Sequence, residues 1–115
     1  MEPVVLIGIG GAIGSLLRFE ATKIQSVGGI PLGTLLVNVI GSFAFSLLTF
    51  SHVPQDLYYL IGLGGLGGFT TFSTFSYETF RLMENHDYYT MGLNILLNVA
   101  GSFIGVYAGY LMVTA

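Results

Sequence analysis

Two rows of uncharged polar side chains are the features of this sequence best suited to chemistry. The rows consist of Asn38, Ser42 and Ser46, and of Asn94, Asn98 and Ser102. In a helix, residues four positions apart share one face, so each row follows one side of its helix. Amides and hydroxyls can replace part of the water shell of an ion that passes between helices. They can equally join two helices by hydrogen bonds, and the pattern leaves both roles open.

A second feature is a glycine-rich stretch followed by hydroxyl and phenylalanine residues. Five glycines fall within residues 62–68, and residues 70–76 read Thr-Thr-Phe-Ser-Thr-Phe-Ser. Glycine disfavours helix, and hydroxyl side chains cap new helix starts. We therefore predict a break over residues 67–70 and a second half-helix that starts near Thr71. Unwound backbone at membrane depth persists only when it is buried in protein or lines a wet cavity, so the break indicates a functional position.

The elements that position these residues are predicted to be membrane helices. The chain is 53% hydrophobic and only 8% charged, whereas about a quarter of the residues of a soluble domain are charged. Apolar runs of the length needed to cross a bilayer, about 20 residues, cover residues 3–23, 32–51, 57–83 and 88–113. The sequence thus predicts a single all-α membrane domain, residues 1–115, with four transmembrane helices and the third broken at mid-membrane.

The charged residues exclude several classes of function. A net charge of −3 argues against nucleic-acid binding, which needs clustered Lys and Arg. The chain has no cysteine, which removes a disulfide framework, a thiolate metal site and a cysteine nucleophile. All six acidic residues map to span ends or loops, and this disfavours a proton-coupled transporter, which keeps an ionisable group at the midplane. Arg18 is the one charge expected inside the hydrophobic zone, near the end of its span, and we predict a structural role for it.

Four motifs in chain order carry a resemblance to a known family. They are Gly10-Gly11-x-x-Gly14-x-x-x-Arg18, Gly33-Thr34-Leu35-x-Val37-Asn38-x-x-Gly41-Ser42-Phe43, the run from Gly67 to Ser76, and Asn98-x-x-Gly101-Ser102. With these motifs the chain resembles the small fluoride channels of the Fluc (CrcB) family over essentially its whole length. Ser46 departs from the pattern, because many relatives have glycine there, and the change should affect packing more than permeation.

The resemblance implies a passive fluoride channel rather than an enzyme. By similarity, the protein spans the cell membrane several times and forms an antiparallel dimer with two pores, surrounded by lipid. Phe72 and Phe75 would form the phenylalanine ladder of the pore, and Asn38 would be its polar amide. Ser102 and Thr74 would be hydroxyls on the side of the pore.

The resemblance also implies a sodium ion as a structural cofactor at the centre of the dimer. By similarity, the backbone carbonyls of Gly67 and Thr70 from both subunits would hold this ion, which does not permeate. A half-helix that starts near Thr71 points its N–H groups, and about half a positive charge, at the midplane, where an anion would be favoured. Because aromatic rings have a positive edge, Phe72 and Phe75 could touch fluoride without a fixed charge.

Two other functions and one assembly question stay open on the sequence. The chain could be a small non-conducting membrane scaffold, or a coupled transporter of another ion. The loop between the first and second spans lies on the same side of the membrane as the loop between the third and fourth. Lys23, Arg81 and Arg18 lie on this side, and the positive-inside rule then places both termini outside. This bias is weak, so we expect an antiparallel homodimer, with a heterodimer containing an oppositely oriented paralogue as the alternative.

Overall fold

Residues 2–114 are described by a computed structural model in which helices and turns account for the fold and no strand is formed. The helical segments in chain order are α1 (Pro3–Ala21), α2 (Leu32–Ser51), α3 (Gln55–Leu57), the π-helix η1 (Tyr58–Leu66), α4 (Gly67–Phe69), α5 (Ser73–Glu84) and α6 (Tyr88–Thr114). The protein is therefore all-α, as predicted.

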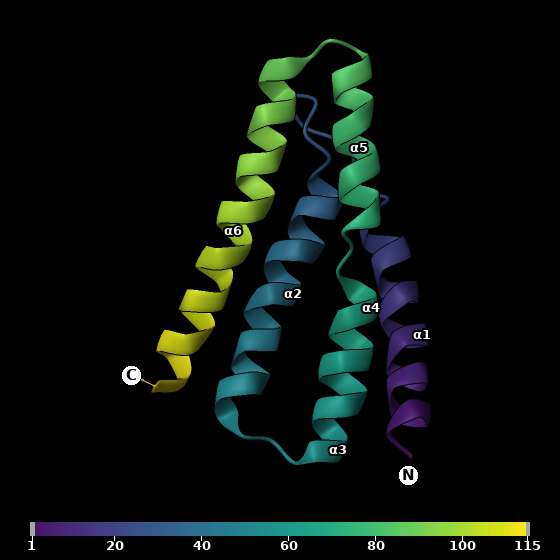
Figure 1. The fold of residues 1–115 in the computed structure, drawn as a ribbon, viewed down its shortest axis with the longest axis vertical. Helices are drawn as coiled ribbons and strands as arrows, with labels where there is room; N and C mark the ends of the chain where they lie inside the picture. Colours follow the sequence, from purple (N-terminus) through teal and green to yellow (C-terminus); the bar gives the residue numbers. More distant parts are fainter. Residues whose placement is uncertain (1, 115) are drawn as a thin grey trace.

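The segments form four rods that alternate in direction (Figure 1). The first rod is α1, the second is α2, the third consists of α3, η1, α4 and α5, and the fourth is α6. The two chain ends lie toward the same end of the molecule (Figure 1). The rods lie in a flat arrangement, with principal extents of 48 × 33 × 18 Å. α2 packs against α6, while α1 packs against η1 and α4.

Three helices are long and apolar enough to cross a membrane, namely α1, α2 and α6. The second predicted span, residues 32–51, coincides with α2, and α1 ends two residues before the predicted end at residue 23. The third predicted span is divided among shorter segments, none of which is long enough alone to cross a bilayer. The chain is thus a multi-pass membrane protein by its helices.

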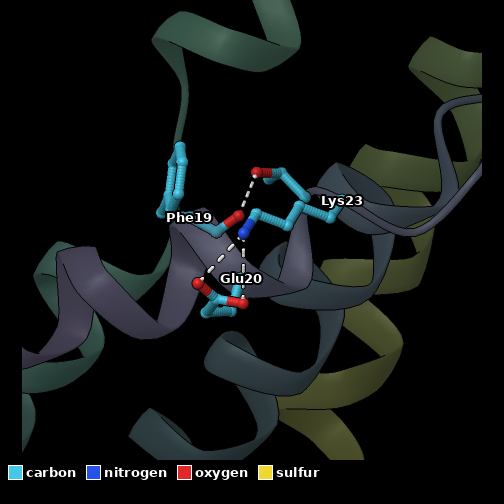
Figure 2. Close-up of polar contacts among 4 residues, drawn as sticks. Phe19, Glu20 and Lys23 are labelled. Atoms are coloured by element: carbon cyan, nitrogen blue, oxygen red, sulfur yellow. Dashed lines mark hydrogen bonds and ion pairs between the residues drawn. The ribbon is translucent and has the colours of Figure 1, made fainter.

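α1 begins and ends at residues suited to those positions. Pro3 at its start has no backbone N–H to leave unpaired. At its end, the Thr22 hydroxyl donates to the Phe19 carbonyl at 3.0 Å, and Lys23 forms an ion pair with Glu20 at 3.2 Å (Figure 2). The Lys23 ammonium also lies 4.8 Å from the centre of the Phe19 ring. The apolar helix therefore ends in a short polar segment, although an ion pair this exposed adds little stability.

Arg18 lies in the last turn of α1 and is partly buried. The carboxyl end of a helix carries a partial negative charge, and a cation there stabilises the helix. Arg18 also keeps its backbone carbonyl in the helix, where it accepts from the N–H of Thr22 at 2.9 Å. The position at the helix end is in keeping with the structural role predicted for Arg18, which stays a prediction.

Glycines bring the backbones of α1 and the third rod into direct contact. A Cβ atom added to Gly10 would overlap the carbonyl oxygen of Leu60, and one added to Gly14 would overlap that of Gly65. A Cβ on Gly64 would lie only 2.6 Å from the Ile7 carbonyl. Helices in lipid associate where small residues allow such approach. The glycine spacing in the first predicted span therefore forms a helix-packing face, as expected.

The π-helix η1 was not predicted. It spans nine residues, Tyr58–Leu66, and includes Gly62, Gly64 and Gly65. π-Helices are rare and appear mostly as single turns, so a run of this length needs support from its surroundings. Here the support is the contact with α1, where the carbonyls of Leu60 and Gly65 press against glycines. The π-helix therefore depends on tertiary contacts with α1, and no local sequence pattern predicts it.

Candidate functional site

The helical path of the third rod is interrupted over residues 70–72. α4 ends at Phe69, Thr70 adopts an extended conformation (φ −79°, ψ 159°), and α5 begins at Ser73. The sequence placed the interruption at residues 67–70 and the restart near Thr71, and both positions were a few residues too early. The chain stays helical through Gly67 and Gly68 because Gly68 packs closely on α1, where its Cβ would lie 2.6 Å from the Gly11 carbonyl.

Asn38 of α2 pairs with the backbone at this interruption. Its Oδ1 accepts from the Thr71 N–H at 2.9 Å, and its Nδ2 donates to the Thr71 carbonyl at 3.1 Å. Thr71 is 5% exposed, so these groups have little access to water. One side-chain amide thus replaces the two hydrogen bonds that an uninterrupted helix would supply.

The same pairing changes which backbone groups are available nearby. The Thr71 N–H would be the helical donor to the Gly67 carbonyl, but it donates to Asn38 instead. The Thr74 N–H would be the donor to the Thr70 carbonyl, but it donates to the Thr71 hydroxyl at 3.0 Å. The carbonyls of Gly67 and Thr70 are therefore left without their helical partners. The first N–H groups of α5, such as that of Ser73, also lack helical acceptors.

The two polar rows face each other across α2 and α6. Asn38 Nδ2 donates to Asn98 Oδ1 at 3.0 Å, and this bond joins α2 to α6. Further along the same helix pair, the Ser46 hydroxyl donates to the Val106 carbonyl at 2.7 Å. At this second position the row acts as a link between helices.

A groove of about 440 Å³ lies beside the interruption, between α2, α5 and α6. Its polar and aromatic lining consists of Asn38, Ser42, Thr70, Thr71, Asn98, Ser102, Phe72, Phe75 and Phe103. The Phe72 and Phe75 rings lie 6.0 Å apart between centroids, tilted by 49°. In the described residues 2–114, no Lys, Arg, Asp or Glu contributes to this lining. The groove can therefore offer dipoles and ring edges to an ion, without a fixed charge.

The structure brings together four of the predicted pore residues. Asn38, Phe72, Phe75 and Ser102 all line the groove, whereas Thr74 does not. Thr74 instead contributes its N–H to the cap formed by the Thr71 hydroxyl.

Asn38 differs from the expectation in its hydrogen bonds. Its Nδ2 donates to two protein oxygens, Thr71 O and Asn98 Oδ1. The amide has only two N–H donors. Asn38 therefore holds the interruption in place rather than offering free N–H groups to an ion.

Two polar positions were not assigned from the sequence. Thr34 lies one turn before Asn38 on α2, and its Oγ1 is buried without a protein partner, as is Oε1 of Glu78 on α5. Buried polar atoms of this kind are normally satisfied by water. Four-residue spacing could have extended the first polar row to Thr34, whereas Glu78 belongs to neither polar row.

Comparison with known proteins gives a consistent family. Residues 5–110 match the family model described as "CrcB-like protein, Camphor Resistance (CrcB)". The chain is 46% identical to "Fluoride-specific ion channel FluC 1" of Methanosarcina barkeri, over 96% of this chain and 97% of the relative. It is 49% identical to "Fluoride-specific ion channel FluC 3" of Methanosarcina acetivorans, over 92% and 96%. A bacterial relative, "Fluoride-specific ion channel FluC" of Shewanella sp., is 42% identical over 98% and 97%.

Proposed function

The chain belongs to the CrcB family, and from that premise we propose that it is a passive, fluoride-selective ion channel through which fluoride leaves the cell. The observation that carries this function is the near full-length match to relatives named as fluoride-specific ion channels, at 42–49% identity. A protein of this kind is a channel and not an enzyme. It lies in the cell membrane as a multi-pass protein, in keeping with its three long apolar helices.

We place the fluoride path along the groove beside the interruption. Helix N-termini favour anions through their free N–H groups and their dipole, and the start of α5 is such a terminus. The positive edges of Phe72 and Phe75 can contact fluoride, and the Ser102 hydroxyl can donate a hydrogen bond. Because each of these interactions is weak, an ion that enters can also leave, as conduction requires. Thr74 does not line the groove of a single chain and is left out of this path.

The groove of a single chain is incomplete, which supports an antiparallel dimer. Phe72 is 79% exposed and Phe103 is 71% exposed, and both lie at the polar groove that contains Asn38. Polar groups that face lipid directly are costly, so a protein surface or water is needed over them. We propose that a second copy in the opposite orientation covers the groove and that the dimer has two pores. A heterodimer with an oppositely oriented paralogue is the alternative.

A sodium ion fits the carbonyl groups freed by the interruption. Gly67 and Thr70 lack their usual helical donors at these carbonyls, and both residues line a pocket of about 410 Å³ against α2. Hard cations prefer oxygen ligands such as backbone carbonyls. We propose that these two carbonyls, with the same pair from the second subunit, hold a central sodium ion. When bound, the ion would supply a fixed positive charge that links the two subunits.

The function is tested by fluoride release from proteoliposomes. We expect the purified protein to release fluoride, followed with a fluoride electrode, while chloride release stays close to that of protein-free liposomes. Dissipating the proton gradient should leave the rate unchanged, because a passive channel needs no coupling ion. A rate that depends on the gradient would favour the coupled transporter. No release from folded protein would favour the scaffold.

The dimer and its sodium ion are tested together by ion replacement. We expect subunits counted by single-molecule photobleaching in lipid to be mostly dimers in sodium, and mostly monomers when a bulky organic cation replaces sodium. The physical reason is that four carbonyl oxygens would face each other without a cation. An equal dimer fraction in both ions would contradict the sodium proposal. Monomers in both would contradict the dimer.

A further inference from the structure

We propose that Asn94 and Thr79 are positioning residues, which act through Asn98 and Asn38 to hold the Thr71 backbone at the interruption. Neither residue touches the ion in this proposal. The effect on ion flow rests on the proposed channel function. The positioning itself does not, and it can be measured separately.

The proposal starts from a continuous relay of hydrogen bonds across three elements. The Thr71 N–H donates to Asn38 Oδ1 at 2.9 Å, and Asn38 Nδ2 donates to Asn98 Oδ1 at 3.0 Å. Asn98 Nδ2 then donates to Asn94 Oδ1 at 3.1 Å, and Asn94 Nδ2 donates to the Thr79 hydroxyl oxygen at 3.1 Å. The relay thus starts at Thr71, two residues before α5, crosses α2 and α6, and returns to α5 at Thr79.

The four bonds named above run in the same direction, and Asn38 Nδ2 makes one further bond back to the Thr71 carbonyl at 3.1 Å. Each amide oxygen accepts from the preceding group, and each amide nitrogen donates to the next one. At Asn38 and Asn98, an amide that turned over would place N–H against N–H or oxygen against oxygen, whereas the Thr79 hydroxyl next to Asn94 can donate as well as accept. The Thr71 backbone fixes the orientation of Asn38, and Asn98 follows because its Oδ1 must accept from Asn38 and its Nδ2 donates to Asn94. Thr79 supplies the acceptor that keeps the Asn94 amide donor paired. Bonds in such chains also polarise and strengthen one another.

Burial separates Asn94 from the ion path. Asn94 is 0% exposed and Asn98 is 4% exposed, so an error in amide orientation cannot be corrected by bulk water. Asn98 has a second anchor, because its Nδ2 also donates to the Asn94 carbonyl at 2.9 Å. Asn94 and Thr79 do not line the groove that contains Asn38. Asn94 therefore has no route to the ion other than through its neighbours.

For Thr79, an effect through the relay must be separated from direct contact with the ion path, because Thr79 lines a neighbouring groove of about 380 Å³ together with Phe75. A change at Thr79 could therefore alter ion flow by direct contact. The two explanations differ at Thr71, eight residues earlier. Only the relay predicts that a change at Thr79 loosens the Thr71 N–H.

The test combines amide hydrogen exchange at Thr71, resolved by NMR in detergent, with fluoride efflux. Thr79→Val keeps the shape but removes the acceptor for Asn94 Nδ2, which leaves a buried donor unpaired. We expect about tenfold faster exchange at Thr71 and about tenfold slower efflux. Thr79→Ser keeps the hydroxyl and should restore both values to within about twofold of wild type. Ser46→Ala is the matched control, because it removes a buried α2–α6 hydrogen bond outside the relay.

The outcomes separate the relay from its alternatives. Unchanged exchange at Thr71 in Thr79→Val would overturn the proposal even if efflux fell, because direct contact would then explain the flow. Exchange raised equally by Ser46→Ala would also overturn it. Should Thr79→Val not fold, Thr79→Cys serves, since a thiol is a weak acceptor. The exchange rate at Thr71 must then be higher in Thr79→Cys than in Thr79→Ser. If exchange at Thr71 were faster in Thr79→Val but the wild-type protein released no fluoride, the channel would be rejected and the relay kept.

Discussion

Replacing Asn38 with alanine should lower fluoride efflux about a hundredfold at equal amounts of reconstituted protein. The variant loses three hydrogen bonds together, two to Thr71 and one to Asn98. Each is worth about 1 kcal/mol on balance, and a total of about 3 kcal/mol corresponds to roughly a hundredfold change. The loss falls on the backbone at the start of α5, where the groove meets the helix. The measurement is the initial rate of fluoride release from proteoliposomes.

The control for this experiment is Ser46→Ala, on the same helix. Ser46 also bonds across to α6, through the Val106 carbonyl, and this bond does not involve residues 70–72. Its loss should cost stability while efflux stays within about twofold of wild type. If Asn38→Ala conducted within about threefold of wild type, the pairing of Asn38 with Thr71 would not matter for the ion path.

The overall fold followed from hydropathy because apolar runs of bilayer length have few alternatives. The second predicted span coincides with α2, and α1 and α6 lie within one or two residues of predicted limits. The third rod was harder, because its path depends on contacts with other helices. Its glycines allow either a break or a helix pressed on α1, and only the packing of Gly68 on Gly11 decides for helix. The length of η1 likewise depends on the packing of the third rod on α1.

The candidate site was partly visible in the sequence for a geometric reason. Four-residue spacing puts Asn38 on one face of its helix and Asn98 on one face of another, and buried amides must find partners. In the structure the two amides are hydrogen-bonded to each other. The direction of each bond and the hydrogen bond between Asn94 and Thr79 could not be predicted, because both depend on how three helices are placed. The contributions of Ser102, Thr74 and the sodium carbonyls stay predictions.

The second large effect is expected at Gly10 in α1. Gly10→Ala adds a Cβ that would overlap the Leu60 carbonyl oxygen, and this backbone atom cannot rotate away as a side chain would. Overpacking costs about 1–3 kcal/mol, which should lower the melting temperature in detergent by about 10 °C or more. Gly8→Ala is the matched control on the same helix, because no atom lies within 4 Å of its added Cβ. It should be neutral, or more stable by up to about 1 kcal/mol.

The comparison of these two glycines also separates folding from conduction. Neither Gly10 nor Gly8 lines the groove beside the interruption, so efflux per folded protein should stay near wild type in both. Heating followed by size-exclusion chromatography measures the folded fraction, and efflux is then divided by it. Equal melting temperatures for the two variants would show that backbone contact between α1 and η1 does not hold the third rod. A loss of efflux per folded protein in Gly10→Ala alone would instead mean that this contact sets the geometry of the interruption, because α1 and α4 are also packed together.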